Sequence, residues 1–99
     1  MHKEIIWSPL SVNDIENTIE YLSDTWNEQV INEFLDEVDL SLQRIALYPR
    51  LYPIINKKLK VRMCVVTKHN TIFYQEKKNT IQLLRIFDTR QDPEKLKFK

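Results

Sequence analysis

The sequence from Lys57 to Arg90 constrains the fold most, because it reads as three consecutive β-strands joined by very short turns. Branched and aromatic residues favour strands, and they fill three runs, residues 57–66, 71–75 and 80–87. The two connections are only three to four residues long. Connections this short join antiparallel neighbours. The stretch therefore predicts a three-stranded antiparallel meander.

Side chains alternate across a strand, so residue parity predicts which residues share a face of this meander. The register assumes that Thr67 pairs with Thr71 and Gln75 with Thr80. One face is then predicted to be apolar and to meet the core, with Leu59, Val61, Met63, Val65, Phe73, Leu84 and Ile86. The other is predicted to be mixed, cationic and aromatic, with Lys58, Lys60, Arg62, Cys64, Tyr74, Ile81, Leu83 and Arg85.

The residues before the meander predict a strand and two helices. Residues 2–7 are branched and aromatic, which indicates a first strand in the same sheet. Ser11 with Asp14 three residues later resembles a capping box, and a helix of about three turns with a solvated Asp14 is expected. A second helix is expected from a cap at Thr25 or Asn27 to about Leu47, because the next residue precedes a proline.

These elements together predict one α+β domain over residues 1–99. An N-terminal strand is followed by an antiparallel two-helix hairpin, which packs on one face of an antiparallel sheet that the meander completes. Residues 49–54 are expected to be an irregular, proline-pinned crossing from helix to sheet. Residues 94–99 are expected to be a short charged tail.

Composition excludes several classes of function. The chain has no glycine, which excludes glycine-rich phosphate loops and dinucleotide fingerprints. Cys64, His2 and His69 are scattered, so neither a metal site nor a cofactor is expected. A lone cysteine, no signal peptide and no long apolar run predict a reducing, cytoplasmic setting with no membrane contact.

Charge divides the chain into two halves although the net charge is only +1. Residues 1–41 hold ten carboxylates against Lys3 alone, and residues 42–99 hold fourteen Lys or Arg against four carboxylates. An anionic partner is therefore expected to meet the second half. The alternative is that the halves only neutralise each other across the fold.

Five residues carry the candidate chemistry. Lys58, Lys60 and Arg62 alternate on a predicted strand, either as a contact for a phosphate backbone or an acidic peptide, or as lysines that keep an edge strand soluble. Arg90 lies in a predicted loop. Tyr74 is interpreted either as a general base or base-stacking platform for RNA, or as a core tyrosine with a satisfied hydroxyl.

Arg85 interrupts an otherwise apolar strand. It therefore needs either a carboxylate partner or solvent at a cleft. His69 is interpreted as a turn residue.

Several short words in this order resemble the RelE/ParE superfamily of bacterial type II toxins, over nearly the whole chain. The words are Ile6-Trp7-Ser8-Pro9, Asp14-Ile15, Ile19-Glu20-Tyr21-Leu22, Tyr48-Pro49, Lys60-Val61-Arg62, Ile72-Phe73-Tyr74 and the run from Leu84 to Pro93. The resemblance implies a small growth inhibitor from a plasmid-stabilization type of module. It also implies a cognate antitoxin that neutralises the toxin and through which the pair meets operator DNA.

The resemblance leaves two activities open. RelE-like members cut mRNA on the ribosome with basic residues and often a Tyr or His near the C-terminus, and ParE-like members inhibit DNA gyrase. Carried over by position, Lys58, Lys60, Arg62 and Arg90 match the basic set of a nuclease.

The tail departs from the nuclease pattern. It ends Leu96-Lys97-Phe98-Lys99, with neither Tyr nor His, so a proton-handling group is missing unless Tyr74 substitutes. The small net charge also fits poorly with an enzyme that binds dense rRNA. We therefore favour gyrase inhibition without chemistry, with mRNA cleavage and an inactive, antitoxin-binding remnant as alternatives.

Overall fold

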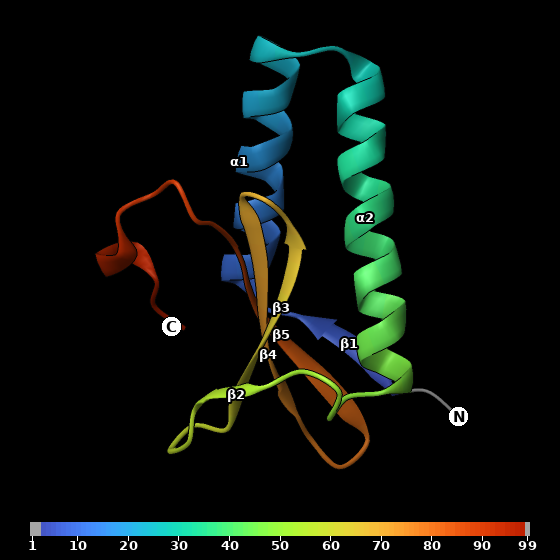
Figure 1. The fold of residues 1–99 in the computed structure, drawn as a ribbon, viewed down its shortest axis with the longest axis vertical. Coiled ribbons are helices and arrows are strands. Elements are labelled where there is room, and N and C mark those ends of the chain that lie inside the picture. The colour runs from blue at the N-terminus through green and yellow to red at the C-terminus, as the bar shows by residue number, and fades with distance from the viewer. Residues whose placement is uncertain (1–2, 99) are drawn as a thin grey trace.

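The computed structural model describes residues 3–98, which form two helices packed on a five-stranded sheet (Figure 1). The elements are β1 (Glu4–Trp7), α1 (Pro9–Thr25), α2 (Glu28–Leu47), β2 (Ile54–Asn56), β3 (Val61–Thr67), β4 (Asn70–Glu76), β5 (Thr80–Asp88) and a short 3-10 helix, η1 (Pro93–Lys95). The predicted α+β architecture, with a helical hairpin on a sheet completed by the β3-β4-β5 meander, is confirmed.

The sheet differs from the prediction in two strands. Its order is β1-β5-β4-β3-β2, and β1 runs parallel to β5, with Glu4 opposite Thr80 and Trp7 opposite Leu83. The sheet is therefore mixed rather than antiparallel throughout. The three-residue strand β2 lies at the end of the crossing that was expected to be irregular, and it pairs with the start of β3. His2, part of the predicted first strand, lies outside the described residues.

Both helices begin at polar caps. Ser8, not Ser11, caps α1, because the Ser8 hydroxyl accepts a hydrogen bond from the Ser11 backbone N–H at 3.0 Å, and Pro9 follows in the first turn. The helix runs for 17 residues, longer than expected. Asn27 caps α2 and the helix ends at Leu47, as predicted. Neither helix is long and apolar enough to cross a membrane among residues 3–98.

Helix α1 covers the edge of β5 beyond the point where β1 ends. The Ser8 hydroxyl donates to the carbonyl of Leu84 at 2.7 Å, and an Asp14 carboxylate oxygen accepts from the Ile86 N–H at 3.0 Å. These side chains satisfy strand groups that would otherwise stay unpaired. Asp14 is buried rather than solvated, so the predicted capping box is wrong: its carboxylate is used by β5.

Arg85 has the carboxylate partner that was one of its two predicted environments. Its Nε and Nη2 atoms donate to the two Asp14 oxygens at 2.7 and 2.8 Å. Its Nη1 donates to the carbonyls of Lys95 and Lys97 at 3.0 and 2.7 Å. This buried pair therefore ties α1, β5 and the C-terminal segment together.

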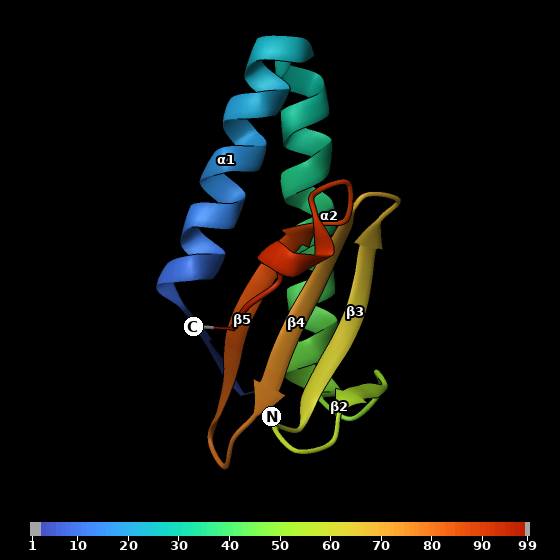
Figure 2. The ribbon, with the colours of Figure 1, turned by 90° about the vertical axis from the view of Figure 1, so that its left-hand side faces the viewer.

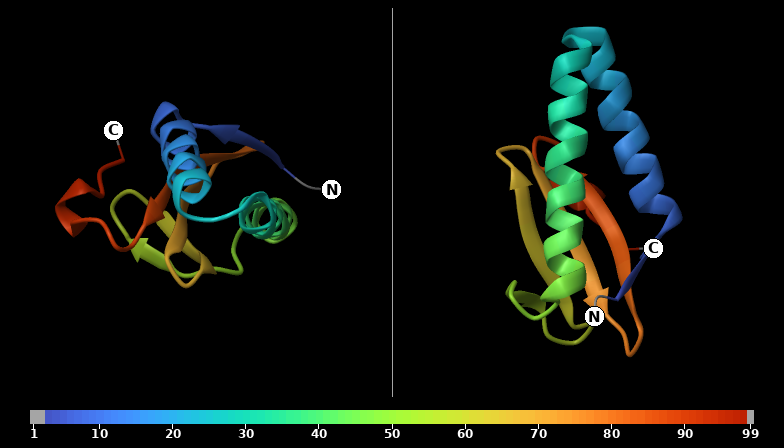
Figure 3. Two further views of the ribbon diagram at one scale, coloured as in Figure 1. Left: turned by 90° about the horizontal axis from the view of Figure 1, so that it is seen from above. Right: turned by 90° about the vertical axis from the view of Figure 1, so that its right-hand side faces the viewer.

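The helices cover the opposite face of the sheet from the one predicted. Helix α2 lies along one face of the sheet (Figure 3). Its side chains Phe34, Val38, Leu42 and Ile45 belong to one core cluster with Cys64, Ile72, Tyr74, Ile81, Leu83 and Ile86. Val61, Phe73 and Phe87 form a second cluster, against which Leu96 and Phe98 of the C-terminal segment pack. Figure 2 shows this segment crossing in front of the sheet, on the side away from α2. Both faces are apolar, so parity alone does not decide which one receives the helices.

A bulge in β5 explains why Ile86 does not lie on the same face as Val61 and Phe73, with which it was predicted to group. Phe73 lies opposite Arg85 but its neighbour Tyr74 lies opposite Leu83, so Leu84 is an extra residue. The parity of β5 changes at that point. Ile81, Leu83 and Ile86 therefore share the helix-covered face although their numbers differ in parity.

Candidate functional site

A cationic cleft is lined by residues of β2 and of the β4-β5 turn, among others. Both elements lie at the end of the sheet remote from the joint between the helices (Figure 1). We call this cleft the basic cleft, and its volume is about 750 Å³. Its lining contains seven cations and a single carboxylate: Lys3, Arg50, Ile54, Lys57, Lys60, Arg62, Glu76, Lys77 and Lys78. An excess of positive charge in a concave surface focuses a positive potential there.

The cations come from separate parts of the chain. Lys3 precedes β1, Arg50 lies between α2 and β2, and Lys77 and Lys78 form the β4-β5 turn. The parallel pairing of Glu4 with Thr80 brings Lys3 beside that turn. No local sequence pattern therefore reveals the cluster.

The turn between β2 and β3 supplies Lys57 and Lys60 to the basic cleft. Its conformation also corrects the prediction made for Lys58 and Lys60. Residues 57–60 form a turn and not the start of a strand, so Lys58 and Lys60 do not share a strand face with Arg62. The Asn56 side chain shapes the turn by accepting from the Leu59 N–H at 2.9 Å, and Lys60 adopts a left-handed conformation with φ of 56°. Lys60 lines the basic cleft and Lys58 is not among its lining residues.

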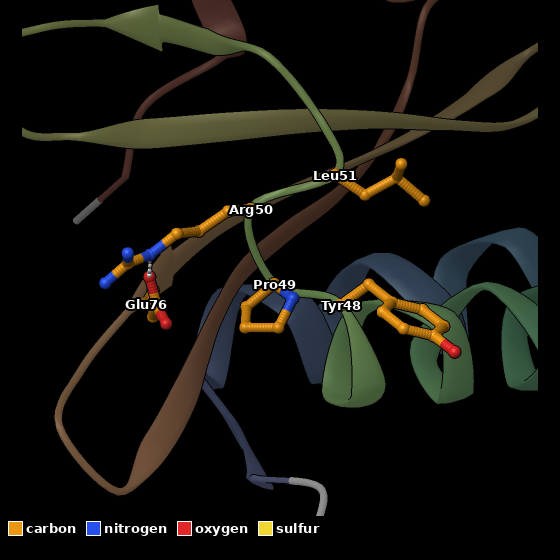
Figure 4. Close-up of a pocket in the computed structure, with 5 residues that line it drawn as sticks. All are labelled: Tyr48, Pro49, Arg50, Leu51 and Glu76. Atoms are coloured by element: carbon orange, nitrogen blue, oxygen red, sulfur yellow. Dashed lines mark hydrogen bonds and ion pairs between the residues drawn. The ribbon is translucent and has the colours of Figure 1, made fainter.

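Glu76 is the one carboxylate of the basic cleft. It accepts from Lys3 Nζ at 2.9 Å. It also accepts from Arg50 Nε at 3.0 Å, the interaction drawn in Figure 4. The hydrogen bond from Lys3, aided by that from Arg50, holds the pKa of Glu76 below its usual value despite partial burial. Glu76 therefore stays ionised and neutralises only part of the surrounding charge.

Arg62 lines the cleft and also fixes the polypeptide around it. Its Nη1 donates to the carbonyl of Tyr52 at 2.6 Å and approaches that of Arg50 at 3.4 Å. These bonds fasten the segment between α2 and β2 to strand β3. Neutral carbonyl partners leave the positive charge of Arg62 uncompensated.

Tyr74 lies in the core and is poorly suited to proton transfer. Its side chain is fully buried, its hydroxyl donates to the carbonyl of Pro49 at 2.7 Å, and its ring packs edge-on against Tyr52. Burial raises the pKa of Tyr74 well above its ordinary value. Of the two interpretations of this residue, the geometry matches the core tyrosine with a satisfied hydroxyl.

Arg90 lies at the other end of the sheet from the basic cleft. It donates to both carboxylate oxygens of Asp88, at 3.0 and 2.8 Å, and its guanidinium lies 5.0 Å from the Tyr21 ring centre. Arg62 lies opposite Tyr74 of β4, and Asp88 lies opposite Asn70 of the same strand. These two positions on β4 are four residues apart, or about 13 Å. The four predicted basic residues are therefore not brought together.

An apolar hollow adjoins the basic cleft and shares two of its residues. It is lined by Tyr48, Pro49, Arg50, Leu51 and Glu76 (Figure 4). In Figure 4 the Arg50 side chain points to Glu76, away from Tyr48 and Leu51. Both of these apolar side chains are exposed, at 62% each, so this end of the molecule offers apolar as well as cationic surface.

The fold and a family profile together define a class of protein. The strand, the helical hairpin and the meander are those of the RelE/ParE superfamily of toxins, which confirms the resemblance stated for the sequence. A family profile described as ParE toxin of type II toxin-antitoxin system, parDE, matches residues 5–93. The chain belongs to this ParE toxin family.

A solved structure supports the same fold. A chain from the chromosomal ParDE TA system from P. aeruginosa aligns with a TM-score of 0.73, covering 88% of this chain and 96% of that one at 11% identity. At this identity the likeness concerns the fold alone. A sequence comparison with curated proteins finds no match.

Proposed function

We propose that this toxin inhibits DNA gyrase by binding it, without chemistry, and that a cognate antitoxin neutralises it. Membership of the ParE family supports the choice of target. The observation that carries the absence of chemistry is the separation of the candidate nuclease residues: Arg90 binds Asp88 and Tyr21, remote from Lys60 and Arg62. A fixed set of charges around one phosphate is what such a nuclease requires.

The state of Tyr74 supports the same proposal. A general base must reach the proton that it takes and must release its own proton near neutral pH. The Tyr74 hydroxyl is buried, donates to Pro49 and has a raised pKa.

A second candidate function, mRNA cleavage on the ribosome, is favoured by one observation. The basic cleft gathers Lys60 and Arg62 with five other cations, which suits an RNA backbone. Under this alternative Lys60→Ala abolishes mRNA cleavage. Under the proposal no cleavage occurs and Arg90→Ala leaves growth inhibition largely intact.

Induction without antitoxin separates the two functions. DNA and protein synthesis are followed by separate pulse labels, and purified gyrase is assayed for supercoiling with the added toxin. The proposal expects replication to stop first and supercoiling to be inhibited. Translation that stops first, with mRNAs cut at defined codons, contradicts it. Co-expression of the antitoxin is expected to reverse the effect.

A further inference from the structure

We propose that the basic cleft binds the phosphodiester backbone of a nucleic acid directly. This inference does not depend on gyrase being the target, because it concerns the isolated toxin and its own side chains. Its basis is an excess of positive charge. Seven of the fifteen Lys and Arg residues of the chain line the basic cleft, whose described lining contains one carboxylate. The candidate residues predicted from the sequence supply only two of the seven.

The charges of the cluster are not balanced within the cleft. Glu76 pairs with Lys3 and Arg50, and like charges gathered in one concave surface repel each other. The remaining five cations of the cleft, Lys57, Lys60, Arg62, Lys77 and Lys78, have no carboxylate partner among residues 3–98. A polyanion is the ligand that converts this repulsion into attraction.

The lining favours a phosphate backbone over an acidic peptide. Peptide recognition relies on pockets for side chains as well as charge. Among the described residues, Ile54 alone is apolar in the lining of the cleft itself, and the exposed Tyr48 and Leu51 belong to the adjoining hollow. Most of the cations are lysines on exposed turns, which act as separate point charges. Such an arrangement fits evenly spaced phosphates without reading a sequence.

The rest of the molecule would orient the nucleic acid. Helices α1 and α2 hold nine carboxylates against Arg44 alone, and their joint lies at the opposite end of a molecule 39 Å long (Figure 1). The hairpin therefore repels a phosphate backbone while the basic cleft attracts it. The acidic first half and the basic second half predicted from the sequence therefore correspond to the helical hairpin at one end and the basic cleft at the other.

Glu76 acts in this proposal as an internal competitor of the phosphate. Its carboxylate occupies Lys3 and Arg50 from within the cleft. A phosphate at the same cations would have to share them with it. Replacing the carboxylate by a neutral amide of the same shape therefore releases two cations for the ligand and is expected to tighten binding.

The test is binding of the full chain to a fluorescent duplex of about 20 base pairs of mixed sequence, followed by anisotropy at increasing salt. Five free cations predict a slope of log K against log salt of about −4.5 for duplex DNA. Single-stranded DNA and duplex RNA of the same length form two further arms. The arm with the tightest binding identifies the source of the backbone.

Three variants make the test specific to the cleft. Lys77→Gln with Lys78→Gln is expected to weaken binding by more than about tenfold and to reduce the slope by about 2. Lys68→Gln with Lys95→Gln removes the same charge from exposed sites outside the cleft and is expected to weaken binding much less. Glu76→Gln is expected to bind about tenfold more tightly.

Three results with the nucleic acids overturn the proposal, and a fourth, with a peptide, overturns it as well. The first three are no binding to any of the three nucleic acids at low salt, equal weakening by the cleft and control pairs, and weaker binding by a folded Glu76→Gln variant. A poly-glutamate peptide that binds more tightly than all three assigns the cleft to an acidic protein instead. Gyrase inhibition is measured separately, so failure here leaves that proposal standing.

Discussion

Asp14 and Glu76 are two carboxylates that bind cations distant in sequence, in contrasting surroundings. Asp14 and Arg85 are almost fully buried, with side chains 6% and 8% exposed, and Arg85 makes four hydrogen bonds. Glu76 lies in an open cleft, where its partner Arg50 is 80% exposed and further cations have no carboxylate partner among residues 3–98. The first cluster is saturated and fixes the fold. The second retains positive charge that a ligand can use.

Removing the buried carboxylate tests this contrast with the largest expected effect. Asp14→Ala leaves Arg85 buried without a counter-charge and the Ile86 N–H without an acceptor. We expect a loss of about 3–5 kcal/mol in the free energy of unfolding, measured in urea. Asp88→Ala is the matched control, since it breaks the more exposed pair with Arg90, and its expected cost is below about 1 kcal/mol.

A double variant separates charge from packing at the same place. Asp14→Ala combined with Arg85→Met leaves no unpaired buried charge, so it is expected to be more stable than Asp14→Ala alone. Equal stabilities of the single and double variants would show that the hydrogen bond to Ile86, rather than the ion pair, carries the effect.

The Tyr74 hydroxyl gives an intermediate effect. Tyr74→Phe leaves the buried Pro49 carbonyl without its donor, and a loss of about 1–2 kcal/mol is expected in the same unfolding measurement. Growth inhibition by the variant is expected to persist, because the proposed gyrase inhibition requires no proton transfer by this hydroxyl. A folded variant that no longer inhibits growth would restore the catalytic interpretation of this residue.

The fold was predictable where one pattern dominates. The apolar row of α2, from Phe34 to Leu42, and the short turns of the meander specify elements that the structure contains. The covered face was not predictable, because the tail residues Leu96 and Phe98 provide apolar contacts for the opposite face. The charged residues around Leu96 and Phe98 in the sequence give no sign that these two side chains cover the sheet.

The site was less predictable than the fold. Lys60 and Arg62 were found from their spacing, but Lys3 joins them only through the parallel pairing of β1 with β5. Asp14 was expected in solvent because nothing in its own helix reveals Arg85, 71 residues away. Pairings over such distances depend on tertiary structure and have no local signal.

The pH dependence of the free energy of unfolding gives a smaller effect, at the ion pairs of Glu76 in the basic cleft. The pKa of Glu76 is lowered by Lys3 and Arg50, so the folded state is favoured by its ionised form. This contribution is present above the unfolded pKa, about 4.3, and disappears as pH falls through the lower folded value. Glu76→Gln should therefore lose less stability between pH 5 and pH 3 than the parent, by less than about 1 kcal/mol in unfolding experiments. Identical pH profiles would mean that the ion pairs at Glu76 contribute nothing to folding.

Lys60 gives the smallest expected effect and the sharpest distinction between fold and charge. Its backbone is left-handed, which disfavours a lysine and suits an asparagine better. Lys60→Asn and Lys60→Gln remove the same charge, so both should reduce the salt slope for nucleic acid by about 1. Only Lys60→Asn also relieves the backbone, and it should be more stable than Lys60→Gln by about 0.5 kcal/mol. If the two variants bind nucleic acid equally but Lys60→Asn is the more stable, lysine at this turn serves the basic cleft at the expense of the fold. If the two variants are equally stable, the argument from the left-handed backbone fails.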